Sequence, residues 1–128
     1  MKQTGTLTIM SLLSILFLTV HLADDIVRGY EKGGVSTLNA VAICTVWLCG
    51  TLLLSERRMG YIVVLLFSIL GTGIPYLHMR GKGLGAAIAG TSGGFFFAWT
   101  LIALGVTTAF SVILSVRGLW ILRNEKKG

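Results

Sequence analysis

Residues 6–23 read TLTIMSLLSILFLTVHLA, and the chain continues with the charged segment DDIVR at 24–28. An apolar run of this length is about what a helix needs to cross a hydrocarbon core of ~30 Å. Three further apolar runs follow, at residues 37–54, 61–77 and 95–116. The pattern predicts an all-α fold, an integral membrane bundle of four transmembrane helices that forms a single domain over residues 1–128.

The composition supports a membrane protein. Hydrophobic residues make up 54% of the chain and charged residues only 12%, with a mean hydropathy of +0.83. An ordinary soluble domain carries about 25% charged residues. The net charge of +6 comes from basic residues between and after the apolar runs, where membrane proteins keep them. The sequence has no Lys/Arg-rich face with interleaved aromatics, which is the pattern typical of a nucleic-acid partner. The expected partner is therefore the lipid bilayer.

The distribution of basic residues predicts the orientation. Four spans place both termini on one side of the membrane. That side carries seven basic residues, namely Lys2, Arg57, Arg58, Arg117, Arg123, Lys126 and Lys127. The other side carries four, namely Arg28, Lys32, Arg80 and Lys82. The excess favours cytoplasmic termini. A cleaved signal peptide is disfavoured, because residues 20–25 offer no small-x-small cleavage pattern.

Small hydroxyl residues form stripes along the predicted helices. Ser11 and Ser14 lie on the same side as His21, and a second stripe in the last run comprises Thr100, Thr107, Ser111 and Ser115. Such stripes usually face neighbouring helices. Four helices enclose little volume, which leaves a homo-oligomer or a subunit role in a larger membrane complex open. Most Trp and Tyr residues lie towards the run ends, as in an aromatic belt, and Trp47 is the exception.

The end of the first run gathers ionisable residues. At about 100° per residue, His21, Asp24, Asp25 and Arg28 share one side of a helix. Such groups at a membrane boundary are costly without water, a partner or a ligand. Imidazole and carboxylate are ligands for divalent metals. The pattern predicts a metal site with the ligands His21, Asp24, Asp25 and His78, provided that the ends of the first and third helices meet. Alternatively, Arg28 and Arg80 bind an anionic headgroup.

Other interpretations use the same residues. Arg28 lies one turn beyond both aspartates and can pair with them without any ligand. His21 and His78 could be the axial ligands of haem b, but neither lies deep in its apolar run, which disfavours that cofactor. A small transporter would need a continuous polar path, for which the hydroxyl stripes alone are too weak.

A membrane enzyme is a further alternative. It would use His21 with Asp24 or Asp25, or Ser92 in the segment GTSGG at 90–94, which matches G-x-S-x-G but lacks the strand that this motif follows. The glycine-rich residues 80–94 form either an outer loop or a segment folded against the bundle. A segment folded over residues 21–28 would favour a sheltered active site.

Four stretches carry a family resemblance, namely HLADDIVRGYEKGG at 21–34, SERRMGY at 55–61, HMRGKGLG at 78–85 and SGGFFFAWTLIALGV at 92–106. In these the chain resembles an uncharacterised family of small bacterial four-helix integral membrane proteins. The resemblance implies the topology and a bacterial origin, but no activity. We therefore expect a multi-pass protein of the bacterial inner (cytoplasmic) membrane that binds a ligand or serves as a complex subunit.

Overall fold

The computed structural model describes residues 2–29, 34–80 and 91–126, and all regular structure in these ranges is helical. The helices are α1 (Lys2–Val27), α2 (Val35–Leu52), α3 (Arg58–Arg80) and α5 (Ser92–Glu125). The predicted all-α class with four helices is confirmed. The helices extend beyond the predicted apolar runs, most of all α5, which continues past residue 116 to Glu125.

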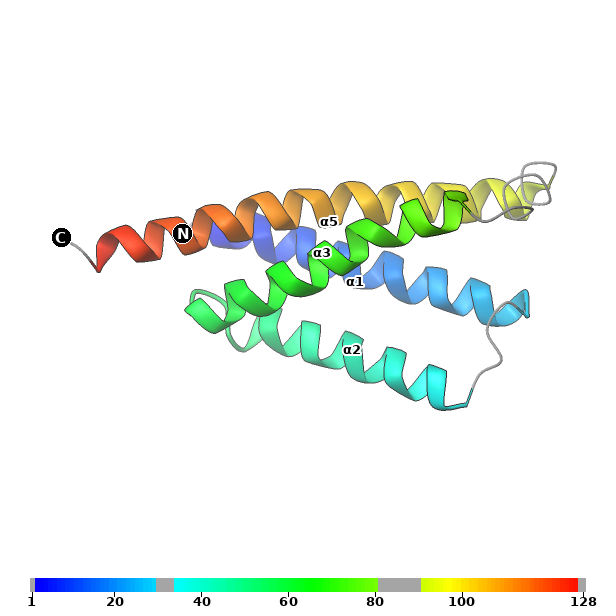
Figure 1. Cartoon of the computed structure of the whole chain (residues 1–128), viewed down its shortest axis with the longest axis horizontal. Coiled ribbons are helices and arrows are strands. Elements are labelled where there is room, and N and C mark those ends of the chain that lie inside the picture. The colour runs from blue at the N-terminus through cyan, green and yellow to red at the C-terminus, as the bar shows by residue number, and fades with distance from the viewer. Residues whose placement is uncertain (1, 30–33, 81–90, 127–128) are drawn as a thin grey trace.

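Successive helices run in opposite directions (Figure 1). The longest helix, α5, runs along the whole bundle and makes its main contacts with α3 and α1, while α2 packs against α3 and α1. The starts of α1 and α3 therefore lie at the same end as the end of α5, which we call the terminal end. The last turns of α1 and α3 meet the first turn of α5 at the opposite end.

Three helices are long and apolar enough to cross a membrane, over Thr4–Val27, Arg58–His78 and Ser92–Glu125. The apolar part of α2, Thr37–Leu52, is shorter. Large hydrophobic side chains are exposed along all four helices, as expected of surfaces that face lipid. The chain is thus a membrane protein by length and composition, and the crossing by α2 stays a prediction.

The interior is built largely from small hydroxyl side chains. Ser11, Ser14, Ser111 and Ser115 are fully buried, as the predicted stripes require. Glycine adds to the close packing, since a Cβ placed on Gly118 would collide with the ring of Tyr61. Without a hydrophobic force between helices in lipid, such close approach supplies the packing that holds a membrane bundle together.

Trp47 departs from the aromatic belt because it belongs to the core. It is 1% exposed, and its indole Nε1 donates a hydrogen bond of 2.8 Å to Ser11 Oγ. Ser11 Oγ also lies 2.7 Å from Thr51 Oγ1, and the Trp47 ring stacks on Phe67 with centroids 5.7 Å apart. One buried tryptophan therefore connects α2 to both α1 and α3.

The turn between α2 and α3 is tight. Glu56 adopts a left-handed conformation with φ of 68°, which is uncommon for a residue with a side chain. A Cβ on Gly60 would collide with the carbonyl of Leu54, so glycine is needed there. This turn lies at the terminal end and carries Arg57 and Arg58 into the start of α3.

Candidate metal centre

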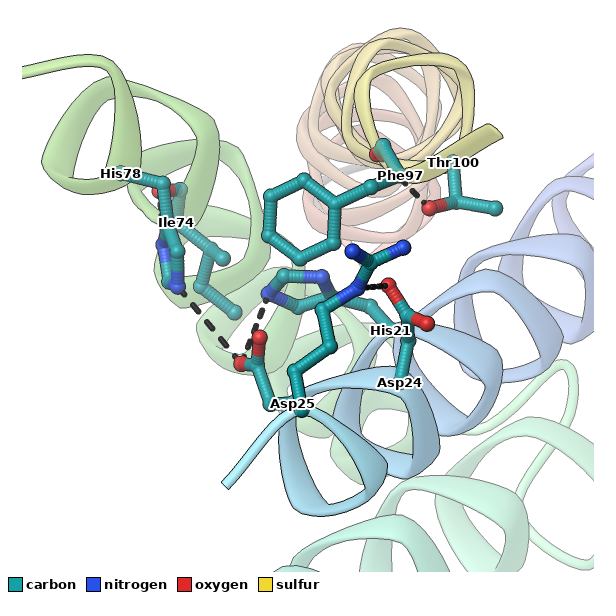
Figure 2. A network of polar contacts seen from close by, with 8 residues as sticks. His21, Asp24, Asp25, Ile74, His78, Phe97 and Thr100 are labelled. Carbon is teal, nitrogen blue, oxygen red and sulfur yellow. Dashed lines mark hydrogen bonds and ion pairs between the residues drawn. The ribbon is translucent and has the colours of Figure 1, made fainter. Parts of the chain in front are cut away.

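Three potential metal ligands converge at the end of the bundle opposite the terminal end (Figure 2). His21 and Asp25 project from one face of α1 at a spacing of one helical turn, and His78 comes from the last turn of α3. His21 Nε2 lies 3.4 Å from Asp25 Oδ2, and His78 Nε2 lies 3.7 Å from the same oxygen. The ends of α1 and α3 thus meet, as a site that includes His78 requires.

The three residues are shielded from solvent to different degrees. His21 is 1% exposed, Asp25 is 6% exposed, and the His78 side chain is 30% exposed. Phe97 of α5 packs over the two imidazoles, with ring centroids 5.0 Å from His21 and 6.3 Å from His78. Burying a carboxylate in such surroundings costs on the order of several kcal/mol, unless a cation or hydrogen bonds compensate for the lost hydration.

Buried polar atoms in this cluster lack hydrogen bonds. Within the described residues, His21 Nδ1, His21 Nε2 and Asp25 Oδ1 have no hydrogen-bond partner. An unsatisfied buried polar atom costs about 1–3 kcal/mol, and native structures rarely gather several of them in one place. His21 Nε2 has the ion-pair contact of 3.4 Å to Asp25 Oδ2, while His21 Nδ1 and Asp25 Oδ1 are left without a hydrogen bond from any described group, so the cluster has room for a further ligand.

The orientation of His78 favours a cation at the cluster. Its Nδ1 lies 3.0 Å from the carbonyl oxygen of Ile74, an acceptor, so in the neutral ring the proton is assigned to Nδ1. Nε2 then presents a lone pair towards Asp25. A lone pair that faces a carboxylate repels it, unless a metal ion or a proton lies between them. A backbone carbonyl that fixes the tautomer in this way is usual for histidines that bind metals.

The spacing of the ligand atoms approaches that of a metal site. Ligand atoms of His21, Asp25 and His78 all lie within 4.8 Å of one another. With bonds of about 2.0–2.1 Å, a tetrahedral zinc ion places its ligand atoms about 3.3 Å apart. The two distances to Asp25, 3.4 and 3.7 Å, are close to that value. A tetrahedral shell would also need the two histidine nitrogens, which lie within 4.8 Å of each other, to be about 3.3 Å apart.

The structure separates the two aspartates. Arg28 Nε donates a hydrogen bond of 2.7 Å to Asp24 Oδ2, and the guanidinium lies over the Phe97 ring, 5.6 Å from its centroid. Asp24, predicted as a metal ligand, lies with Arg28 rather than in the cluster. Asp25 lies beside the two histidines instead. The alternative that pairs Arg28 with an aspartate thus fits Asp24, while Asp25 needs another explanation.

The remaining predicted residues lie elsewhere or outside the described residues. Ser92 is exposed in the first turn of α5, where Gly94 N–H donates to the capping Thr91 Oγ1 at 3.0 Å. Residues 81–90 and the side chain of Arg80 lie outside the described residues, and so does most of the predicted 80–94 segment.

Haem b does not fit between the two histidines as they stand. The rings of His21 and His78 touch edge to face, with centroids 4.7 Å apart and planes at 78°. Axial ligands of a haem lie on opposite faces of the macrocycle, which needs free space between the two rings. The geometry suits one small ion held by both imidazoles better than a cofactor inserted between them.

Phe97 is the part of the centre that the sequence reasoning missed. It covers both imidazoles and supports Arg28. The aromatic run FFF at 95–97 was the available signal, but it does not reveal which ring faces inward. Comparison with family models, curated proteins and solved structures gave no match, so the family resemblance stays a prediction.

Proposed function

We propose that this chain is a small membrane protein that binds one divalent transition-metal ion through His21, Asp25 and His78. One observation carries the proposal: nitrogen and oxygen atoms of α1 that lack hydrogen bonds lie, largely buried, within 4.8 Å of an imidazole of α3. A cation bound there would take one ring nitrogen from each histidine and a carboxylate oxygen of Asp25, and the second ring nitrogen of His21 would still lack a hydrogen-bond partner among the described residues. The cation would also join the ends of α1 and α3, two helices that otherwise contact each other less than either contacts α5.

The donor set selects the class of metal. Two imidazoles and one carboxylate suit Zn²⁺ and other divalent ions of the first transition row, while Mg²⁺ and Ca²⁺ prefer shells of six or more oxygens. Three protein ligands leave a fourth position for water or an added ligand. The partly exposed His78 provides the side from which an ion and that fourth ligand would enter.

The membrane context gives the site a place in the cell. We propose a bacterial cytoplasmic membrane crossed by all four helices, with both termini in the cytoplasm. The larger number of Lys and Arg residues at the terminal end supports this orientation. The metal would then bind at the outer boundary of the bilayer and would exchange with the outer aqueous phase.

Equilibrium metal binding to the untagged, full-length protein in lipid nanodiscs tests the proposal. Wild type should bind one equivalent of Zn²⁺ per chain. His21→Ala, His78→Ala and Asp25→Asn should each weaken binding at least tenfold, because each removes a ligand. Asp24→Asn is the matched control and should bind as wild type does. The proposal fails if wild type does not bind Zn²⁺ more tightly than Mg²⁺. It also fails if Asp24→Asn and Asp25→Asn have the same affinity for Zn²⁺.

A second pair of variants separates the centre from the thiols. Cys44 and Cys49 are free, and thiolates are strong zinc ligands. The Cys44→Ser and Cys49→Ser variants should keep the stoichiometry and affinity of wild type. Loss of binding in either serine variant, with normal binding by His78→Ala, would assign the ion to the cysteines and reject the proposed centre.

A further inference from the structure

A second binding region lies at the terminal end, far from the metal centre along the bundle. A cleft of about 910 Å³ lies there, lined by residues from the first turns of α3 and the last turns of α5. This volume is within the range of sites that bind small molecules, about 300–1,000 Å³. The α2–α3 turn contributes Glu56 and Arg57 to its lining.

The helices α3 and α5 pack closely beside the cleft. The ring of Tyr61 on α3 lies where a Cβ on Gly118 of α5 would be, so the two helices touch at this level. From there α5 continues to Glu125, while α3 begins at Arg58. The cleft lies beside this contact, at the end of α3 where α5 continues.

The rim of the cleft is strongly basic. It carries Arg57, Arg58, Arg123 and Lys126, against the single carboxylate of Glu56. Among the described residues, none of these four cations forms an ion pair. Arginine presents a planar fork of donors that matches a phosphate group. The rim thus offers uncompensated positive charge to an anionic group.

The wall of the cleft is apolar. Ile62, Leu119 and Leu122 are half-buried in the lining, and Trp120 adds a large ring that is 64% exposed. Apolar side chains and tryptophan next to basic residues are typical of the level where lipid headgroups meet acyl chains. A ligand that matches both parts has an anionic head and an apolar body.

We propose that this cleft binds an anionic phospholipid, with its phosphate at the basic rim and the first part of an acyl chain along the apolar wall. Charge complementarity selects the lipid: a zwitterionic lipid carries its own cation and would gain less from the four basic side chains. The inference stands apart from the metal centre, because the two regions share no residue and lie at opposite ends of the bundle.

Native mass spectrometry of the full-length protein tests the proposal with phosphatidylglycerol and phosphatidylcholine of identical acyl chains. Wild type should bind phosphatidylglycerol at least tenfold more tightly. Arg123→Gln should lower that affinity about fivefold, from the usual contribution of one cation near an anionic membrane surface. Arg117→Gln removes the same charge from α5 outside the cleft lining, and should change the affinity less than twofold.

Three outcomes would overturn the inference: equal binding of both lipids, equal losses in the two arginine variants, or full displacement of phosphatidylglycerol by inorganic phosphate. Arg58→Gln provides an independent variant if Arg123→Gln does not fold. His78→Ala should leave the lipid preference unchanged. Failure of metal binding and failure of lipid binding are therefore separate results.

Discussion

The sharpest prediction compares two neighbouring carboxylates in thermal unfolding. Asp24 and Asp25 are adjacent in sequence, but Asp24 pairs with Arg28 while Asp25 lies between the two histidines. Asp→Asn at either position removes one negative charge and keeps the side-chain shape. Only Asp25→Asn removes a proposed metal ligand, so only that variant should lose its response to Zn²⁺.

The expected size of the response follows from linkage. A ligand present at one hundred times its Kd stabilises the folded state by about 2.7 kcal/mol. For a chain of this length, 1 kcal/mol shifts the Tm by about 4 °C, so Zn²⁺ should raise the Tm of wild type by about 10 °C. The Tm of each variant is measured with and without Zn²⁺, and the difference between the two values is compared among variants. This comparison removes the effect that each substitution has on the stability of the metal-free protein.

The assay is unfolding in nanodiscs, followed by tryptophan fluorescence, with Mg²⁺ as the control ion. Asp24→Asn should retain the shift of about 10 °C, since it loses only the partly exposed ion pair with Arg28, and an i,i+4 helix pair of this kind is worth about 0.3–0.5 kcal/mol. Asp25→Asn should show less than a third of the Tm shift that Zn²⁺ causes in wild type. A full Tm shift in Asp25→Asn, or equal stabilisation of wild type by Mg²⁺ and Zn²⁺, would rule out Asp25 as a ligand of a selective metal site.

Further predictions concern pH, the core and the turn. Zn²⁺ affinity should fall as the pH is lowered, because a metal binds only the deprotonated form of its ligands, and pH-independent binding would argue against histidine ligands. Trp47→Phe should lower the free energy of unfolding by about 1 kcal/mol, because the bond to Ser11 is lost; an unchanged denaturation midpoint would contradict this. Gly118→Val should lower the free energy of unfolding by about 1–3 kcal/mol, because the new side chain would clash with the ring of Tyr61. A Tm equal to that of wild type would show that the two helices are not closely packed at this contact. Glu56→Gly should stabilise by about 1 kcal/mol by relieving the left-handed backbone, and a lower Tm would refute that view of the turn.

Local patterns predicted the four helices and part of the centre. The apolar runs predicted all four helices. The last run was predicted to end at residue 116 because Arg117 interrupts the apolar sequence there, whereas α5 continues to Glu125. The spacing of His21 and Asp25 predicted that one helix face would bring them together. The same spacing of one turn joins Asp24 to Arg28. The i, i+4 spacing therefore pairs Asp25 with His21 and Asp24 with Arg28, and this distinguishes the two aspartates in the sequence itself. Assigning all four residues to one side of the helix overlooked the distinction.

Long-range packing determined what the sequence could not predict. His78 joins the cluster only because the ends of α1 and α3 meet, and no local pattern specifies that contact. Phe97 covers the cluster because α5 presents that ring, and not its neighbours, to the interior. Trp47 is buried because α2 packs against both α1 and α3. Each depends on how whole helices are placed.

X-ray absorption spectroscopy of the zinc-loaded, untagged protein tests the metal centre most directly. We expect one Zn²⁺ per chain with nitrogen and oxygen ligands at about 2.0–2.1 Å, and with the outer scattering of two imidazoles. His78→Ala should reduce that imidazole contribution to one ring or abolish binding. A sulfur shell at about 2.3 Å, a shell of oxygens alone, or no stoichiometric zinc would contradict the centre formed by His21, Asp25 and His78.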